Sequence, residues 1–135
     1  MKWYLDFGHG GKDPGAIGPT NLKESDVALK IGMIIKENLE NAFEKVITTR
    51  DNDKYYSLDY RTKKANNENC DYFISIHLNS ATNTSAKGCE VWLYNENSKL
   101  KKAFKVTKEE ILFKKTNSYI HYNTSNAKTK DGLRS

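Results

Sequence analysis

The chain has 135 residues and a mass of 15.5 kDa, which fits one domain and excludes two independent hydrophobic cores. Charged residues make up 29% of the chain, but the aromatic content of 11% argues against a disordered polymer. No apolar run approaches the roughly 18 residues of a membrane-spanning helix, and Asp6 interrupts the N-terminal run that a signal peptide would need. We therefore expect a single domain, made in the cytoplasm without a signal peptide.

The positive charge is concentrated in the last third of the chain. The net charge is +5, but residues 1–96 contain 12 Lys and Arg against 14 Asp and Glu, whereas residues 97–135 contain 10 against 3. Such an asymmetry is typical of attraction to a polyanion, either nucleic acid or an anionic cell wall. The alternative is a solvated helix face, carrying the lysines of residues 99–115, followed by a polar tail.

The cysteines and one histidine carry little functional information. Cys70 and Cys89 form no CxxC pair and have no histidine at zinc-finger spacing. We expect both to be small buried residues beside strands, in a reducing compartment. His121 has no acidic or histidine partner at ligand spacing, so we expect it at the surface.

The N-terminal half of the chain alternates apolar runs with a glycine-rich loop. Residues 2–7 (KWYLDF) are mostly apolar and end at a glycine, which predicts a buried strand. Five of the eight glycines fall within residues 8–18, which predicts a loop. Apolar residues at helical spacing predict an amphipathic helix over residues 24–43, and the VITT run at 46–49 predicts a second strand.

The remaining elements are predicted after residue 56. We expect a helix at residues 57–67, a strand at 72–78 (YFISIHL), a strand at 89–94 and a basic helix at 98–115, with no clear period afterwards. This order predicts an α/β fold, a three-layer sandwich in which helices flank a mixed, mostly parallel sheet. Four strands are expected, and the chain then stops in a polar stretch. We therefore expect the domain of residues 1–135 to lack its last strand or strands, which would expose a sheet edge for association with another chain.

Three reactive side chains are predicted to meet at one edge of this sheet. His9 directly follows the first strand, His77 ends the third, and Glu24 stands where the loop enters the first helix. Ligands of open α/β sheets collect at the carboxyl ends of parallel strands. Two histidines and one glutamate match the three protein ligands of a catalytic zinc site, which leaves a fourth position for water.

Each of these residues also has a structural interpretation. Glu24 could form a capping pair with Asn21 at a helix N-terminus, and His77 could be a hydrogen-bonded core histidine. His9 is harder to explain in this way, because the glycines beside it allow close approach to a ligand. A dinucleotide-binding loop is excluded, because Asp13 replaces the third glycine of GxGxxG and a Pro-Gly turn stands where the helix should begin.

Short segments spread over residues 2–95 form a specific pattern: LDFGHGGKDPGAIG (5–18), LKESDVAL (22–29), TRD (49–51), LDYR (58–61), DYFISIHLNS (71–80) and GCEV (88–91). This pattern resembles that of the zinc-dependent N-acetylmuramoyl-L-alanine amidases of the amidase-3 family. These proteins are the cell-wall hydrolases of bacterial autolysins and phage endolysins. The resemblance implies hydrolysis of the amide between N-acetylmuramic acid and L-alanine in peptidoglycan.

The resemblance also implies roles for individual residues. His9, Glu24 and His77 would be the zinc ligands, and Asn79 and Ser80 would line the substrate groove. Two arginines of the pattern, at positions 50 and 61, are expected to form ion pairs with a nearby aspartate.

The sequence departs from the family at the catalytic acid/base. The family places this glutamate on a late strand, in an apolar segment resembling PAVLVE, and no such segment follows Tyr94. Glu90 could take the role only if its side chain faces the metal, and a surface or cross-strand carboxylate is the alternative.

The sequence therefore predicts a zinc-dependent peptidoglycan amidase, truncated at its C-terminus and without an identified acid/base. The alternative is a non-catalytic, zinc-containing fragment that binds the cell wall. Nucleic acid is supported only by the basic last third, without a recognised motif, and no membrane insertion is expected. Because peptidoglycan lies outside the membrane, a chain without a signal peptide fits an endolysin, which acts on the wall after release, better than a secreted autolysin.

Overall fold

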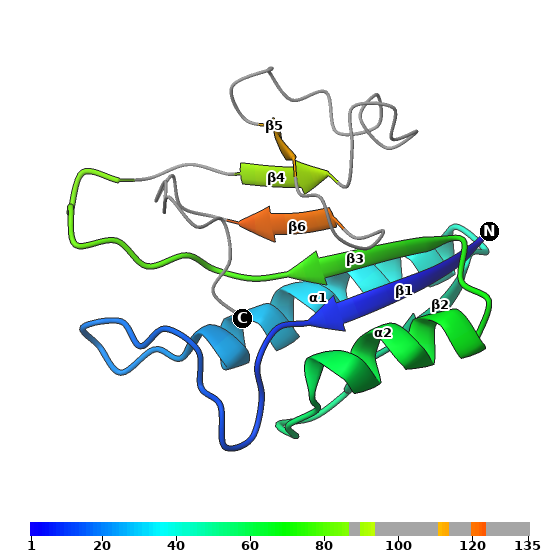
Figure 1. The fold of residues 1–135 in the computed structure, drawn as a ribbon, viewed down its shortest axis with the longest axis horizontal. Helices are drawn as coiled ribbons and strands as arrows, with labels where there is room; N and C mark the ends of the chain where they lie inside the picture. The colour runs from blue at the N-terminus through cyan, green and yellow to red at the C-terminus, as the bar shows by residue number, and fades with distance from the viewer. Residues whose placement is uncertain (87–89, 94–110, 114–119, 124–135) are drawn as a thin grey trace.

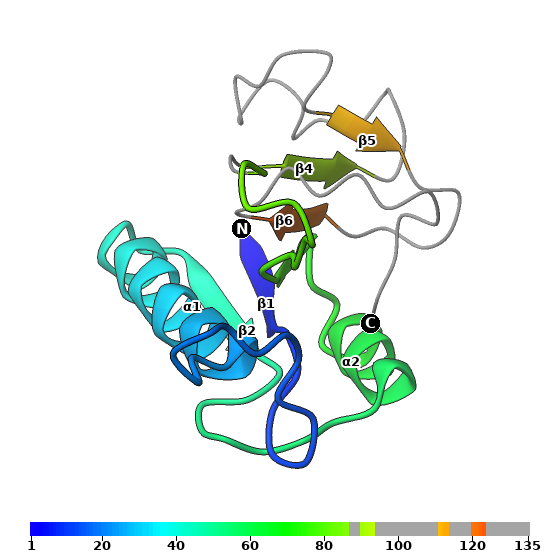
Figure 2. The same cartoon turned by 90° about the vertical axis from the view of Figure 1, so that its left-hand side faces the viewer.

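The computed structural model describes residues 1–86, 90–93, 111–113 and 120–123. These residues form six strands and two helices, arranged as one sheet between two helical layers (Figures 1 and 2). In chain order they are β1 (Lys2–Phe7), α1 (Glu24–Asn41), β2 (Lys45–Thr48), α2 (Leu58–Asn67), β3 (Tyr72–Ile76), β4 (Glu90–Leu93), β5 (Ile111–Phe113) and β6 (Ile120–Asn123).

The sheet is mixed and mostly parallel, with the strand order β2-β1-β3-β6-β4-β5. β1 pairs in parallel with β2 and β3, and β3 pairs in parallel with β6. β4 runs antiparallel to β6 and parallel to β5. α1 and α2 lie on opposite faces of the sheet (Figure 2), so the predicted three-layer α/β architecture is confirmed.

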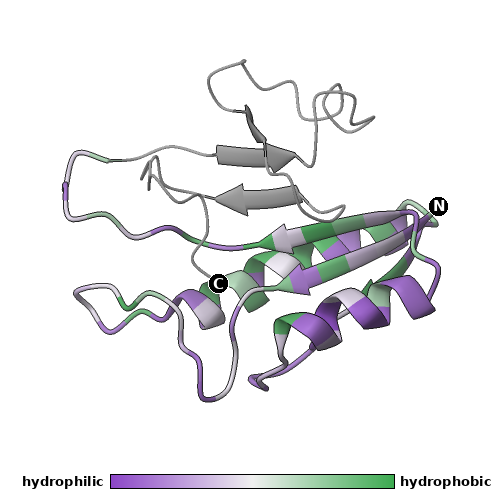
Figure 3. Cartoon of the chain, viewed as in Figure 1, coloured by the Kyte–Doolittle hydropathy of each residue, from purple (hydrophilic) through white to green (hydrophobic). Residues whose placement is uncertain are grey.

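The two faces of β1 differ in polarity because side chains alternate along a strand. Leu5 and Phe7 are fully buried on the face covered by α1, where they join Ala28 of α1 and Ile74 and Ile76 of β3 in the hydrophobic core. Figure 3 shows the same contrast in the helices, since α1 carries apolar residues among its polar ones whereas α2 is mostly hydrophilic.

The opposite face of β1 points toward α2 and combines the fully buried Tyr4 ring with the buried carboxylate of Asp6. α2 buries Arg61 and Ala65, and the Arg61 guanidinium reaches Asp6 on β1. The helix begins after Ser57, whose side chain accepts a hydrogen bond from the backbone N–H of Tyr60. α2 is thus fixed to the sheet by hydrogen bonds and an ion pair as well as by apolar packing.

Most of the predicted elements are confirmed to within a few residues, but the C-terminal third is not. The helix predicted at 98–115 is wrong where the structure describes it, since Ile111–Phe113 is strand β5. β6 was not predicted, and the described sheet has six strands instead of four. Short apolar runs such as these do not distinguish strand from helix by periodicity, and their pairing partners decide the outcome.

Some expectations fall outside the described residues. They include the placement of Cys89, the side chain of His121 and the solvated lysine face at 99–115, apart from the strand correction above. Cys70 is a free thiol and only half-buried, so the expectation of a buried residue is wrong for it. Neither helix in the described part of the chain is long and apolar enough to cross a membrane.

Candidate metal centre

His9, Glu24 and His77 lie together at the carboxyl edge of the sheet. His9 follows β1, Glu24 is the first residue of α1, and His77 follows β3. His9 Nε2 lies 3.1 Å from Glu24 Oε1, His77 Nδ1 lies 3.0 Å from the same oxygen, and the two nitrogens are 3.1 Å apart. All three residues are buried. The side chains predicted to converge therefore do so.

The orientation of His9 is set by Asp13. His9 Nδ1 lies 2.9 Å from Asp13 Oδ2, while Asp13 Oδ1 accepts a hydrogen bond from the backbone N–H of Gly15. A carboxylate on Nδ1 favours a proton there, and this leaves Nε2 to bind a metal. Burial lowers the pKa of His9, but hydrogen bonds to Glu24 and Asp13 outweigh it and raise the pKa. The role of Asp13 was not predicted, although it lies four residues after His9.

Both oxygens of Glu24 are held by backbone donors. Oε1 accepts a hydrogen bond from the N–H of Leu78 at 2.8 Å, and Oε2 accepts one from the N–H of Ala16 at 2.9 Å. Burial alone would raise the pKa of Glu24, but hydrogen bonds from both histidines and from Ala16 lower it. The carboxylate also lies in the first turn of α1, where the helix dipole favours negative charge. Glu24 is thus kept ionised.

The capping interpretation of Glu24 is wrong. The N-cap of α1 is Lys23, which makes no side-chain capping hydrogen bond, and Asn21 lies in the preceding loop. His77 is buried as a core histidine would be, but its Nδ1 faces the other two candidate ligands.

Two glycines make room for the three side chains. A Cβ atom on Gly8 would lie 2.6–2.8 Å from the His77 ring. A Cβ on Gly15 would lie 2.5 Å from Cδ2 of His9 and 2.8 Å from Oε2 of Glu24, and Gly15 also has a φ of +65°. Larger residues at either position would displace a candidate ligand, which explains part of the glycine content of this loop.

The three donor atoms fit a zinc ion. Tetrahedral zinc with bonds of about 2.0–2.1 Å to nitrogen and oxygen places its ligand atoms about 3.3 Å apart, close to the spacing found here. Two imidazoles and one carboxylate also form a ligand set of catalytic zinc sites. In the described residues, these side chains form a group able to hold a metal ion.

Two buried arginines, Arg50 and Arg61, lie beside the site. Arg61 pairs with Asp6 at 2.7 Å, as expected, and also donates to the carbonyl oxygens of Phe7 and His9. Burial raises the pKa of Asp6, but Arg61 and hydrogen bonds from Thr49 and Ser75 lower it. These hydroxyl donors were not predicted; the carboxylate inside the apolar run of β1 was their only signal.

The expected ion pair of Arg50 is wrong. Within residues 1–86, the partners of its guanidinium are backbone carbonyl oxygens, those of Phe7, Gly8, Ser25 and Asn52. The carbonyls accept these bonds at the carboxyl end of β1 and the start of α1, so a nearby aspartate is not required to satisfy the guanidinium.

The other predicted site residues lie at the same edge of the sheet. Asn79 is half-buried and Ser80 is exposed, and both follow His77 after the intervening Leu78. Glu90 is the first residue of β4 and pairs in register with Asn123 of β6, and Ile76 pairs with the adjacent Tyr122. Glu90 therefore lies two strands from the end of β3, at the edge that carries His77. Its side chain is outside the described part of the structure.

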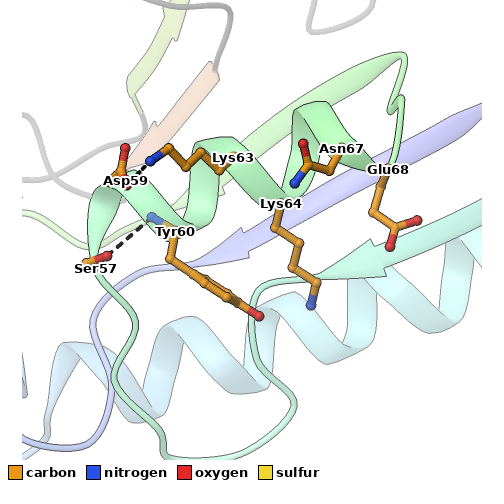
Figure 4. Close-up of a pocket in the computed structure, with 7 residues that line it drawn as sticks. All are labelled: Ser57, Asp59, Tyr60, Lys63, Lys64, Asn67 and Glu68. Carbon is orange, nitrogen blue, oxygen red and sulfur yellow. Dashed lines mark hydrogen bonds and ion pairs between the residues drawn. The ribbon is translucent and has the colours of Figure 1, made fainter.

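A concave surface lies over α2 and does not include the candidate ligands (Figure 4). Several of its polar groups have structural partners: Ser57 caps the helix, Lys63 pairs with Asp59 at 2.8 Å and Lys64 donates to the carbonyl of Thr48. The chemistry of the chain is therefore expected at the sheet edge. The lining residues are Ser57, Asp59, Tyr60, Lys63, Lys64, Asn67 and Glu68.

This chain is similar to known proteins in both sequence and fold. The sporulation-specific N-acetylmuramoyl-L-alanine amidase of Bacillus subtilis is 42% identical over 96 residues, which are 70% of this chain and 36% of that protein. The endolysin of Bacillus phage SPP1 is 41% identical over 96 residues, 70% of this chain and 34% of the endolysin. The solved structure of the N-acetylmuramoyl-L-alanine amidase AmiC2 of Nostoc punctiforme has a TM-score of 0.78 and 30% identity, covering 93% of this chain and 79% of that one.

The chain spans about a third of the length of the first two relatives. Residues 4–132 match the family described as N-acetylmuramoyl-L-alanine amidase (Amidase_3), so the match extends well past residue 95, where the resemblance of the motifs ended. Because this match covers nearly the whole chain, the chain belongs to the N-acetylmuramoyl-L-alanine amidase family.

Proposed function

We propose that this chain is a zinc-dependent amidase that hydrolyses the bond between N-acetylmuramic acid and L-alanine in peptidoglycan. The observation that carries the proposal is the convergence of His9, Glu24 and His77, with donor atoms 3.0–3.1 Å apart, in a member of this family. A zinc ion bound by these three ligands would supply a Lewis acid that makes water a better nucleophile and polarises the scissile carbonyl.

The chain's own residues would hold the ligands in place. Asp13 keeps the proton of His9 on Nδ1, and the N–H groups of Ala16 and Leu78 fix both oxygens of Glu24. Preorganised donors cost no rearrangement during the reaction. Asn79 and Ser80, which lie two and three residues after His77, are proposed to contact the substrate next to the reacting amide.

Amide cleavage also requires a proton for the departing amine, and a positioned acid is worth about 10²–10⁴-fold in rate. Glu90 is a candidate for this role because its backbone lies at the edge of the sheet that carries His77. Without an acid, the same zinc site would give a chain that binds the cell wall but cleaves it slowly. These two outcomes are separable by experiment.

The test is digestion of purified peptidoglycan by the 135-residue chain. We expect new amino termini of L-alanine, detected by labelling of free amines, and their loss after chelation and after His77→Ala. Glu90→Gln should lower the rate by about 10²-fold or more if Glu90 is the acid. Sedimentation with peptidoglycan and no new amine, at any zinc concentration, would contradict the enzyme and support the binding fragment.

The proposed place of action is the cell wall. The similarity to the endolysin of phage SPP1 supports a role in wall lysis after release from the cell that makes the chain. Expression with and without a membrane-permeabilising partner tests this, and we expect lysis only when the partner is present.

A further inference from the structure

Arg50 is buried beside the candidate metal centre, and its hydrogen bonds go to backbone carbonyl oxygens. It follows β2 and Thr49, and only 3% of its surface is exposed. Burial and the neighbouring Arg61 both disfavour its charge and lower its pKa. A buried guanidinium is costly unless its donors are satisfied, so its partners indicate what it does.

The partners of Arg50 are the backbones on both sides of the site. One terminal nitrogen, Nη2, donates to the carbonyl of Gly8 and to the carbonyl of Ser25, both at 2.8 Å. Gly8 immediately precedes His9, and Ser25 immediately follows Glu24. A single nitrogen atom therefore joins the backbone next to one candidate ligand to the backbone next to another.

The remaining donors hold the guanidinium at a fixed angle. Nε donates to the carbonyl of Phe7 at 3.0 Å, and Nη1 donates to the carbonyl of Asn52 at 2.9 Å. The planar, rigid fork of an arginine suits such an arrangement, whereas a lysine ammonium is a point charge on a flexible stem.

The loop between the candidate ligands His9 and Glu24 contains an uncommon backbone conformation. His9 and Glu24 are separated by a glycine-rich loop, and His9 itself has a φ of 59°, a left-handed conformation that is uncommon outside glycine. Arg61 supports this conformation by donating to the His9 carbonyl, but it does not reach α1 in any hydrogen bond found among residues 1–86. Arg50 reaches both segments.

We propose that Arg50 is a positioning residue, which sets the distance between His9 and Glu24 by joining the end of β1 to the first turn of α1. This inference rests on the proposed zinc function of the site. It predicts that Arg50 affects zinc affinity separately from its effect on folding. Without Arg50, the backbone segments that carry His9 and Glu24 would be less ordered, and zinc binding would have to order them at a cost in affinity.

The test measures zinc affinity and stability in the same variants of the 135-residue chain. Zinc Kd is obtained by competition with a chromophoric chelator, and unfolding of the metal-free chain is followed by urea titration. Arg50→Lys is the informative change, since it keeps the charge and loses the fork. Arg50→Met removes the charge as well. Trp3→Ala is the matched control, because Trp3 lies at the opposite end of β1 and bonds Glu44.

We expect Arg50→Lys to raise the zinc Kd by roughly 10–100-fold, the effect typical of groups that hold metal ligands. Trp3→Ala should lower the urea midpoint and leave the Kd unchanged. The absorption spectrum of bound Co²⁺ should change in Arg50→Lys and not in Trp3→Ala, since it reports ligand geometry. If Arg50→Met fails to fold, Arg50→Lys still decides the question.

An unchanged Kd in a folded Arg50→Lys variant would overturn the inference and leave the proposed function intact. A Kd that rises in Arg50→Lys and Trp3→Ala in proportion to their loss of stability would also overturn it, since that result shows a structural effect alone. A folded wild-type chain that binds no zinc would remove the proposed function, and this inference with it.

Discussion

The two faces of β1 perform different tasks with neighbouring residues of one strand. On the α1 side, Leu5 and Phe7 enter an apolar core with Ile74 and Ile76. On the α2 side, Asp6 accepts bonds from Arg61, Thr49 and Ser75. The apolar face supplies stability in proportion to the area that it buries. The polar face fixes the ends of the strands, from which the candidate ligands project.

This difference implies that damage to each face has a distinct signature. Loss of an apolar side chain leaves a cavity but no unpaired charge, so the geometry of the candidate metal centre should change little. Loss of a polar partner leaves a buried charge without compensation, and it loosens the backbone that carries His9.

The largest effect is expected at Asp6. Asp6→Asn leaves Arg61 buried without its carboxylate, which should cost about 3–5 kcal/mol of unfolding free energy. Leu5→Ala, one residue away on the apolar face, should cost about 2–5 kcal/mol. Urea unfolding of the metal-free chains gives both values.

The dependence on pH separates the two variants. The pKa of Asp6 is lowered in the folded chain, so its contribution is complete above its unfolded pKa of about 3.9 and is lost as the pH falls through the folded value. The stability difference between wild type and Asp6→Asn should therefore shrink below about pH 4. The difference for Leu5→Ala should not, and a parallel decline in both would contradict the proposed contrast.

A smaller effect is expected at Asp13, on metal affinity. Asp13→Ala removes the carboxylate from His9 Nδ1 and should weaken zinc binding by roughly 10–100-fold. Asp53→Ala is the control, because Asp53 accepts a bond from the Gly11 N–H in the same loop region without touching a candidate ligand. Isothermal titration calorimetry with zinc measures the affinity of both variants. An equal loss of zinc affinity in Asp13→Ala and Asp53→Ala would show that general loop order, and not the orientation of His9, sets the affinity.

The smallest effect is expected at the start of α2. Ser57→Ala removes the N-cap of that helix and should cost about 1 kcal/mol of unfolding free energy. Zinc affinity should remain that of the wild type, because Ser57 acts on the helix and not on the sheet edge. A fall in affinity here would mean that α2 as a whole, and not only Arg61, positions the site.

The sequence was sufficient to predict the convergence of the candidate ligands. Apolar runs marked β1 and β3, and the rule that parallel strands end at one edge placed His9 beside His77. The contacts of Asp13 and Arg50 were beyond such reasoning. They depend on left-handed turns in a loop and on carbonyl groups, which have no signature in the side-chain pattern.

The C-terminal strands were missed for a related reason. Ile111–Phe113 and Ile120–Asn123 are runs of three and four residues, too short to show a period. Both are strands because neighbouring strands pair with them: β6 lies between β3 and β4, and β5 pairs with β4. Pairing across 20 or more positions of sequence is a property of the folded chain.

The most direct test of the central claim is the metal content of the purified chain. After zinc supplementation and dialysis, elemental analysis should find about one zinc per wild-type chain, as one three-ligand site requires, and almost none in folded His77→Ala. A folded wild-type chain without zinc, or a His77→Ala chain that retains it, would contradict the assignment of His9, Glu24 and His77 as the metal ligands.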